Sequence, residues 1–224
     1  MTKTFVVLAA VTLFFAGCNS DKDTTKFVTD SSAIPTAAST DIAEPVVTDS
    51  NQTSPGNSLM TSMNTSTAKM QSMQMTGDFD ADYANMMIEH HQGALDMAQI
   101  ELTQGKDEKM KAKAQEILTN QKGDQQKLKD FVNSYKPSGM KHGEGEMHKS
   151  MTEMMGKQKA MQMSGDVDMD FAMMMTMHHE QGISMAEMEV KNGMSDKLKQ
   201  MAKKEINAQK RDIADFKSWM SGKM

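Results

Sequence analysis

The sequence predicts an all-α protein whose main part consists of two tandem copies of a three-helix unit. Residues 58–136 align with residues 146–224 at a constant offset of 88, without a gap, and 26 of the 79 aligned positions are identical. Apolar residues recur every three or four positions in both copies, which is the spacing of one face of a helix, and neither copy shows the alternation of a strand. Because a period of 88 residues is too long for a solenoid repeat, a duplicated helical domain that forms a bundle fits best.

The first copy is expected to have helices at about 58–75, between Gly77 and Gly105, and over 110–135, and the second copy repeats them 88 positions later. Glycine at the end of an apolar pattern commonly marks the end of a helix. Residues 137–145 contain one proline and three glycines and are expected to link the two copies. The second copy, residues 146–224, then continues to the end of the chain.

The segment that precedes the first copy predicts export and anchoring. Residues 1–17 combine a lysine with a short apolar run, which is typical of an export signal. The sequence from Phe15 to Cys18 resembles a bacterial lipobox, so we expect Cys18 to be lipidated; an ordinary signal with an incidental cysteine is the alternative. Residues 18–57 are rich in Ser, Thr, Asp, Ala and Pro and are expected to form a disordered tether. The prediction is a lipid-anchored protein of the bacterial cell envelope, in the periplasm or at the cell surface.

The composition indicates a role for methionine sulfur and argues against a nucleic-acid partner, a disulfide and a cysteine-ligated zinc site. The chain has 28 methionines and only 5% aromatic residues, so methionine fills positions that leucine, isoleucine and valine usually occupy. The formal net charge is −5, and no basic block is present, so no nucleic-acid partner is expected. The single cysteine excludes a disulfide within the chain and a cysteine-ligated zinc site.

Two adjacent histidines follow two adjacent methionines in the middle helix of each copy. Residues four apart share a helix face, so Met86 lies beside His90 and Met87 beside His91. Thioether and imidazole form a soft ligand pair that suits copper, above all Cu(I), with Cu(II) as a second candidate. Met97 lies on the same stripe two turns later, and the second copy repeats the whole pattern. The candidate metal ligands are Met86, Met87, His90, His91, Met97, Met174, Met175, His178, His179 and Met185.

A second group of candidate ligands lies on the first helices, in the linker region and beside the second histidine pair. Its members are Met73, Met140, His142, Met147, His148, Met151, Met161 and Met177. Methionines at helical spacing often only fill a core, and the segment around His142 has a solvated linker as its alternative. His90 and His91 are about 100° apart around a helix. We therefore expect one to meet the methionine-rich first helix and the other to face the third helix or the other copy.

Polar residues also interrupt the helical pattern at matching positions. Gln121 and Gln209 break the apolar stripes of the two third helices. A buried amide needs a hydrogen-bond partner, so each glutamine either orients a histidine or bonds to the backbone of a neighbouring helix. Asp78, Asp80 and Asp82 are expected to cap and stabilise a helix start rather than to bind calcium, because the glycine of a calcium loop is missing.

The pattern M-x-x-x-H-H-x-x-x-x-x-M-A, followed by a helix with a central glutamine, resembles the DUF305 family (domain of unknown function 305). The resemblance covers about residues 73–135 and 161–220. The first copy keeps the usual HHQ in His90-His91-Gln92, whereas the second has Glu180 at the third place. The resemblance implies a ferritin-like helical fold. It also implies an exported copper-binding protein, because some relatives bind copper outside the cytoplasm and contribute to copper tolerance.

These observations predict a non-catalytic protein that sequesters or delivers copper, with silver as a competing ion and a copper donor or acceptor protein as a partner. Thioethers do not protonate in water, whereas imidazole does near pH 6.5. Cu(I) binding should therefore persist in mild acid, and Cu(II) binding should weaken. The alternatives are a methionine-rich scaffold that binds a partner protein and a copper-dependent oxidoreductase. No glutamate has a histidine three residues later, so the ligand pattern of a di-iron centre is missing.

Overall fold

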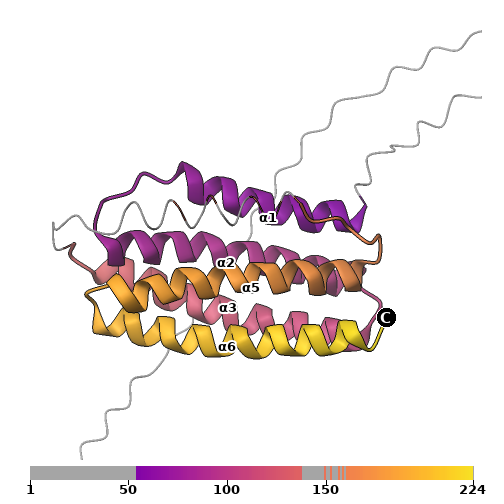
Figure 1. Ribbon diagram of the computed structural model, residues 1–224. Coiled ribbons are helices and arrows are strands. Elements are labelled where there is room, and N and C mark those ends of the chain that lie inside the picture. Colours follow the sequence, from indigo (N-terminus) through magenta and orange to yellow (C-terminus); the bar gives the residue numbers. More distant parts are fainter. Residues whose placement is uncertain are drawn as a thin grey trace, which may run out of the picture. The chain divides into compact units, whose positions relative to one another are not determined.

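The computed structural model describes residues 54–137 and 160–223, together with Lys149, Thr152, Gly156 and Gln158. This part of the chain contains helices and no strand, which confirms the all-α prediction (Figure 1). All described helices belong to one compact unit, residues 49–224. None of them combines the length and the apolar character that a membrane span requires. The predicted export signal, Cys18, nearly all of the tether and most of the linker lie outside the described residues.

The observed helix boundaries follow the capping signals of the sequence. In the first copy the helices are α1 (Pro55–Ser72), α2 (Phe79–Gln104) and α3 (Glu108–Ser134). In the second copy they are α5 (Val167–Asn192) and α6 (Asp196–Ser221). The helix α1 begins three residues before the predicted start, because proline is well suited to a first helical position. The side chain of Asp78 accepts a hydrogen bond from the backbone N–H of Ala81 and so caps α2 as predicted.

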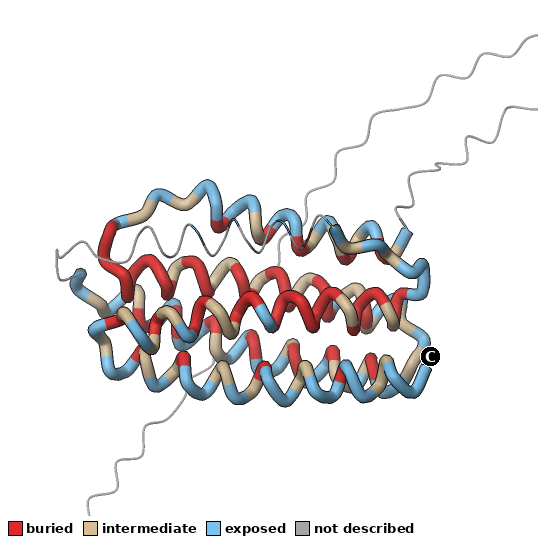
Figure 2. The backbone as a smooth tube through the Cα atoms, viewed as in Figure 1, coloured by how far each residue is buried: buried red, intermediate tan, exposed pale blue. Residues whose placement is uncertain are grey.

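Two central helices, α2 and α5, form the middle of the bundle and run antiparallel (Figure 1). The helix α3 packs on α2, α6 packs on α5, and α1 lies against both central helices. Figure 2 shows buried residues along most of α2 and α5, whereas α6 alternates between buried and exposed positions. The central helices therefore carry the core, and the outer helices close it with one face each.

The antiparallel arrangement sorts the candidate methionines into two groups. Met86 and Met87 of α2 lie in one apolar cluster with Met185 of α5. By the same arrangement, Met97 of α2 lies in the other cluster with the second copy's methionines at 174 and 175. All six of these side chains are almost completely buried. Each cluster thus joins methionines from both copies, on either side of the histidines.

Two buried aspartates connect each copy to the loop of the other. Asp80, in the first turn of α2, accepts hydrogen bonds from the backbone N–H groups of Met194 and Ser195, which precede α6; the shortest distances are 3.0 and 2.8 Å. In the same way, Asp168 in the first turn of α5 accepts bonds of 2.9 Å from the N–H groups of residues 106 and 107, which precede α3. We call these two groups of contacts the aspartate clamps. They satisfy N–H groups at helix starts that would otherwise lack partners.

A buried glutamate lies next to the aspartate of each clamp. Glu189 at the end of α5 neighbours Asp80, and Glu101 at the end of α2 neighbours Asp168. Burial, with a further contribution from the neighbouring aspartate, raises the pKa of each glutamate. Gly105 has an ordinary φ of −67°. It is needed because a Cβ atom there would collide with the carboxyl group of Glu101. Space, rather than left-handed backbone, therefore explains why glycine ends this helix.

Candidate metal centre

The two first histidines of the pairs meet at the centre of the bundle. The rings of His90 and His178 stack with their centroids 3.7 Å apart and their planes 28° from parallel. His90 Nε2 lies 3.1 Å from the carbonyl oxygen of His178, and His178 Nε2 lies 2.9 Å from the carbonyl oxygen of His90. The two residues are equivalent in the repeat, so this reciprocal contact marks the axis that relates the two copies. Gly93 of α2 lies beside it, because a Cβ atom there would come within 3.3 Å of His178 Nε2.

The second histidines of the pairs point away from this stack toward carboxyl groups of α6. His179 Nε2 lies 3.2 Å from Asp212 Oδ2, and His91 Nε2 lies 3.5 Å from Glu205 Oε1. The prediction that neighbouring histidines face different interfaces is therefore confirmed. Both histidines of the first copy take their polar contacts from the second copy, and the expected contact with the first helix is replaced by the contact of His90 with α5. The cause is the antiparallel packing of α2 and α5, which helical periodicity cannot predict.

All four imidazoles present the same nitrogen for binding. A carbonyl oxygen can only accept, so Nε2 of both stacked rings carries the hydrogen, and the contacts of His91 and His179 with carboxyl oxygens favour the same tautomer. In each ring the Nδ1 atom is buried and has no hydrogen-bond partner. An unprotonated, unpartnered ring nitrogen in a buried position is an available metal ligand. The buried side chains of His90, His91, His178 and His179 thus offer four such nitrogens.

Burial keeps His90, His91 and His178 neutral at pH values well below the usual pKa of imidazole. It lowers the pKa of His91 to about 4 and that of His178 to about 3, and neighbouring imidazoles add to both effects. The pKa of His90 is also lowered well below its ordinary value, first by burial and then by the nearby His178. In the metal-free protein, proton competition at these three rings therefore begins in stronger acid than the value of 6.5 for free imidazole implies.

The carboxyl groups of the core shift in the opposite direction. Burial raises the pKa of Glu189 to about 9, with Asp80 contributing, and that of Glu101 to about 8, with Asp168 contributing. Burial also raises the pKa of Glu205 to about 8, with the charge of Asp124 contributing. These glutamates are therefore mainly neutral acids at pH 7.

We expect the metal-free protein to be most stable between about pH 4.5 and 6.5, the unfolded-state pKa values of glutamate and histidine. Glutamates whose folded pKa is raised stabilise the fold below pH 4.5, and this contribution is lost as the pH rises through about 8 to 9. Histidines whose folded pKa is lowered favour the fold above pH 6.5, and this contribution is lost as the pH falls through about 4 to 3. Urea unfolding at a series of pH values with a chelator present measures this profile.

The variant Glu189→Gln serves as the control for that profile. It keeps a neutral group in the buried position, so the decline of the urea midpoint above pH 7 should become shallower while the acid side stays unchanged. A midpoint that rises steadily from pH 5 to pH 9 in the unmodified protein would contradict the predicted profile.

The candidate methionines lie in the same helices as the histidines, within the two apolar clusters described above. Of the second group, Met177 is buried in the cluster that contains Met97. Met161 packs at the edge of that cluster and Met73 at the edge of the other, both partly buried. Met140, His142, Met147, His148 and Met151 lie outside the described residues.

Nitrogen and oxygen ligands alone do not form a metal site in the described residues. There, no three side chains of the His, Cys, Asp and Glu types converge as a ready ligand set. The thioethers nearest in sequence to the buried imidazoles are those of the methionines that flank the histidines in α2 and α5. Such a mixed set of nitrogen and sulfur ligands suits copper in its lower oxidation state.

The two interrupting glutamines occupy matching buried places between α3 and α6. The amide nitrogen of Gln209 donates a 2.8 Å hydrogen bond to Glu205 Oε1, the same oxygen that faces His91. This glutamine therefore acts on a histidine through a carboxyl group rather than directly. Gln121 is buried as well, and its Oε1 atom has no hydrogen-bond partner.

Sequence reasoning missed the polar residues that surround the histidines. Asp212 and Glu205 contact His179 and His91, and Asp80 ties α2 to the far loop. The repeat carried a signal for part of this set, because Asp80 is identical to Asp168, and Asp212 to Asp124, at the offset of 88. Glu205 has Ile117 as its equivalent, so no repeat signal existed for it.

Comparison with known proteins agrees with this fold. The family described as "Domain of unknown function (DUF305)" matches residues 29–132 and 80–220. A crystal structure of a DUF305 fragment from Deinococcus radiodurans is similar with a TM-score of 0.50 and 14% sequence identity, and the match covers 65% of this chain and 97% of that one. Comparison with curated proteins gives no significant match. The two family matches together span most of the sequence, and the chain therefore belongs to the DUF305 family.

Proposed function

We propose that this protein is an exported, membrane-anchored copper-binding protein that sequesters or delivers copper without catalytic turnover. The observation that carries the proposal is the set of four buried imidazoles whose Nδ1 atoms have no partner. A buried polar atom without a hydrogen bond is costly, so its retention in equivalent positions of both copies calls for a ligand. Metal binding would supply that partner.

The chemistry of the surroundings supports copper over harder metals. The apolar clusters of the bundle contain methionine sulfur from both copies, on the helices that carry the histidines, and thioethers favour Cu(I). The imidazoles of His91 and His178 are neutral because burial lowers their pKa, so their lone pairs are available. Silver(I) should compete with Cu(I), since both are soft ions. Export and lipidation at Cys18 rest on the N-terminal sequence pattern.

The alternative of a methionine-rich scaffold has less support. The six candidate methionines of α2 and α5 are buried rather than displayed on a surface. In the described part of the chain, the one large apolar side chain that is strongly exposed is Met194. A docking face rich in methionine would need several such side chains side by side.

Metal binding by the purified protein tests the proposal. Protein loaded with Cu(I) under reducing conditions and passed over a desalting column should retain copper, and a chromophoric Cu(I) chelator should remove it only at excess. Silver should displace the copper, and zinc and magnesium should not. Protein that yields all its copper to an equimolar chelator would contradict the proposal, and capture of a partner protein without metal would favour the scaffold.

A further inference from the structure

A row of cavities follows the boundary between α3 and α6, on the outer side of the histidine pairs. We call it the α3–α6 seam. Cavities along it are lined from Asp107 and Lys223 at one end to Leu128 and Met201 at the other. The central cavity has a volume of about 450 Å³, and residues of both helices line it. The helices α3 and α6 pack on α2 and α5, which carry the histidine pairs.

Buried acceptor atoms line the central cavity. Gln121 and Gln209 are equivalent in the repeat and are 7% and 1% exposed, and neither Oε1 atom has a hydrogen-bond partner. A Cβ atom at Gly182 would lie 2.5 Å from Gln209 Oε1 and 2.9 Å from the Cε1 atom of His90. The amide oxygen of this glutamine therefore lies close to the stacked imidazoles.

Two carboxyl groups line the same cavity and contact the other two histidines. Asp212 lines the cavity and has Oδ2 at 3.2 Å from His179 Nε2. Glu205 also lines it and has Oε1 at 3.5 Å from His91 Nε2. The histidine side chains are 0% and 1% exposed, whereas those of Asp212 and Glu205 are 16% and 10% exposed. Carboxyl oxygens thus lie between solvent and the Nε2 atoms of the two buried imidazoles.

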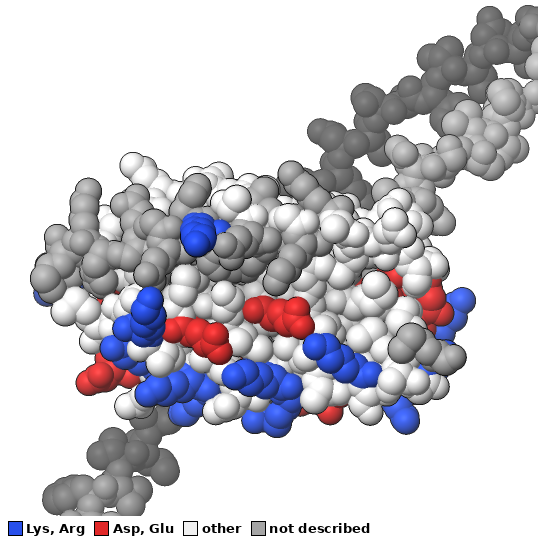
Figure 3. Space-filling model, viewed as in Figure 1, with Lys and Arg blue, Asp and Glu red and all other residues white. Residues whose placement is uncertain are grey.

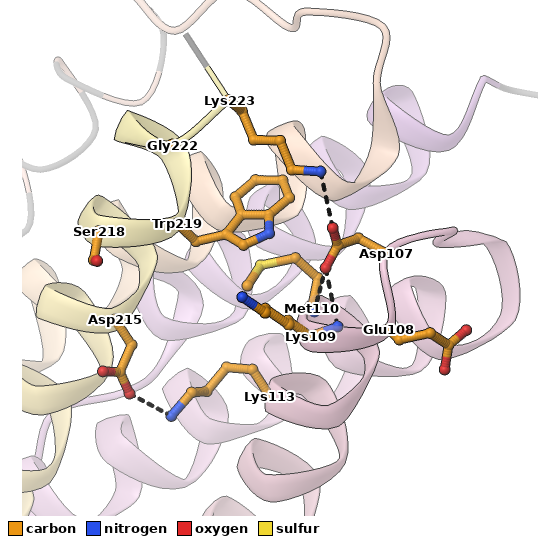
Figure 4. A pocket seen from close by; sticks show the side chains of 10 residues that line it. All are labelled: Asp107, Glu108, Lys109, Met110, Lys113, Asp215, Ser218, Trp219, Gly222 and Lys223. Atoms are coloured by element: carbon orange, nitrogen blue, oxygen red, sulfur yellow. Dashed lines mark hydrogen bonds and ion pairs between the residues drawn. The ribbon is translucent and has the colours of Figure 1, made fainter.

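A lysine ammonium already occupies the outer end of this arrangement. Lys113 Nζ lies 2.7 Å from Asp215 Oδ2, 2.9 Å from Glu116 Oε2 and 3.3 Å from Asp212 Oδ1. Its side chain is only 14% exposed, and it lines both the central cavity and the end cavity. Figure 4 shows Lys113 reaching across the seam to Asp215, with Trp219 farther along the same cavity. The equivalent position in the second copy is Met201.

We propose that the central cavity of the α3–α6 seam is the site where a metal cation first binds on its way to the buried histidines, and that Lys113 is a tethered cation which this ion displaces. The inference rests on the proposed copper binding. A group of carboxylates that holds an ammonium ion also attracts a free cation, and clustered charge of one sign raises the association rate of the opposite ion. The unpartnered amide oxygens of Gln121 and Gln209 supply further ligands inside the cavity.

The surface agrees with a route on this side of the bundle. The helix α1 covers α2 and α5 elsewhere, and Lys69 is the one charged residue in it. Figure 3 shows acidic and basic side chains gathered toward α6 on the face that it draws. A cation approaching the α1 side would meet no carboxylate of that helix.

The association rate of silver(I) tests this inference, with stopped-flow quenching of Trp219, the single tryptophan, as the signal. The variant Lys113→Met gives the first copy the residue of the second, and it should bind silver about tenfold faster. The variant Gln121→Leu places apolar atoms in the cavity and should slow binding. The number of bound ions, measured by native mass spectrometry, should stay unchanged in both.

The matched control is Lys111→Met, which removes one positive charge from the same helix, where Lys111 pairs with Glu108 at the surface. Equal rates in Lys111→Met and Lys113→Met, or an unchanged rate in Gln121→Leu, would overturn the inference. Absence of silver from the unmodified protein would instead contradict the proposed function, so the two failures are distinguishable. Both lysine variants should fold, because a partly exposed ion pair contributes only about 1 kcal/mol or less. Circular dichroism checks this.

Discussion

Replacing Asp80 with alanine should lower the free energy of unfolding by about 3 kcal/mol. The substitution removes the acceptor for the N–H groups of Met194 and Ser195, at 3.0 and 2.8 Å. It also leaves the buried carboxyl group of Glu189 without its neighbour. Each unsatisfied buried group costs about 1 to 3 kcal/mol. The loss would be large for a protein whose total stability is of the usual order of 5 to 15 kcal/mol.

Urea unfolding at pH 6 measures this loss, and two further variants make it specific. Asp96→Ala on the same helix removes a carboxylate whose hydrogen bond is to Gln92 of its own helix, so it should change stability by about 0.5 kcal/mol or less. Asp80→Asn retains an oxygen acceptor and should recover part of the loss. Adding Asp168→Ala at the other clamp should roughly double the effect, because the two clamps share no contact. Equal costs for Asp80→Ala and Asp96→Ala would contradict the role given to the clamps.

Replacing the four buried histidines by glutamine should lower the affinity for Cu(I) by about 100-fold or more. Glutamine keeps an N–H donor for the carbonyl and carboxyl partners of Nε2 but offers no aromatic nitrogen at the Nδ1 place. Cu(II) binding should be lost altogether, because thioethers are poor ligands for it. Competition with chromophoric chelators of known affinity measures both oxidation states. The pairs His90 with His178, and His91 with His179, should be replaced separately as well, to show which nitrogens contribute more.

The matched variant replaces Met86, Met87 and Met185 by leucine, which conserves volume at modest cost to stability. It removes the thioethers of one cluster and leaves every imidazole in place. Cu(I) affinity should fall about tenfold or more, whereas Cu(II) affinity should stay unchanged. If the leucine variant binds Cu(I) as tightly as the unmodified protein, the methionines are core residues without a ligand role.

Helix positions and the histidine pairs were predictable because their signals are local. The apolar stripe from Met110 to Phe131 and the glycine ends at Gly105 and Gly193 appear where the sequence places them. The reason for those glycines was not predictable. A turn signal suggests left-handed backbone, whereas the structure uses the missing side chain to make room for a glutamate.

The partners of the candidate residues could not be predicted from any window of the sequence. His90 meets His178 across a separation of 88 residues, and His179 meets Asp212 on another helix. The repeat showed that Asp80 and Asp168 were equivalent, but it could not show that each serves the loop of the other copy. Asp78 caps α2 and Asp80 lies in its first turn, as expected, but only packing shows that Asp80 also binds the loop before α6.

By itself the sequence determined that the protein is helical and duplicated, and that each copy carries a pair of histidines beside methionines. These properties depend on periodicity over a few residues and on comparison of the two halves. The tertiary structure alone decided that α2 and α5 run antiparallel, which stacks the two central imidazoles, groups Met86 and Met87 with Met185, and opens the seam between α3 and α6. The physical reason is that an apolar face specifies that a helix is buried, whereas the neighbour it meets is set by the packing of the whole chain.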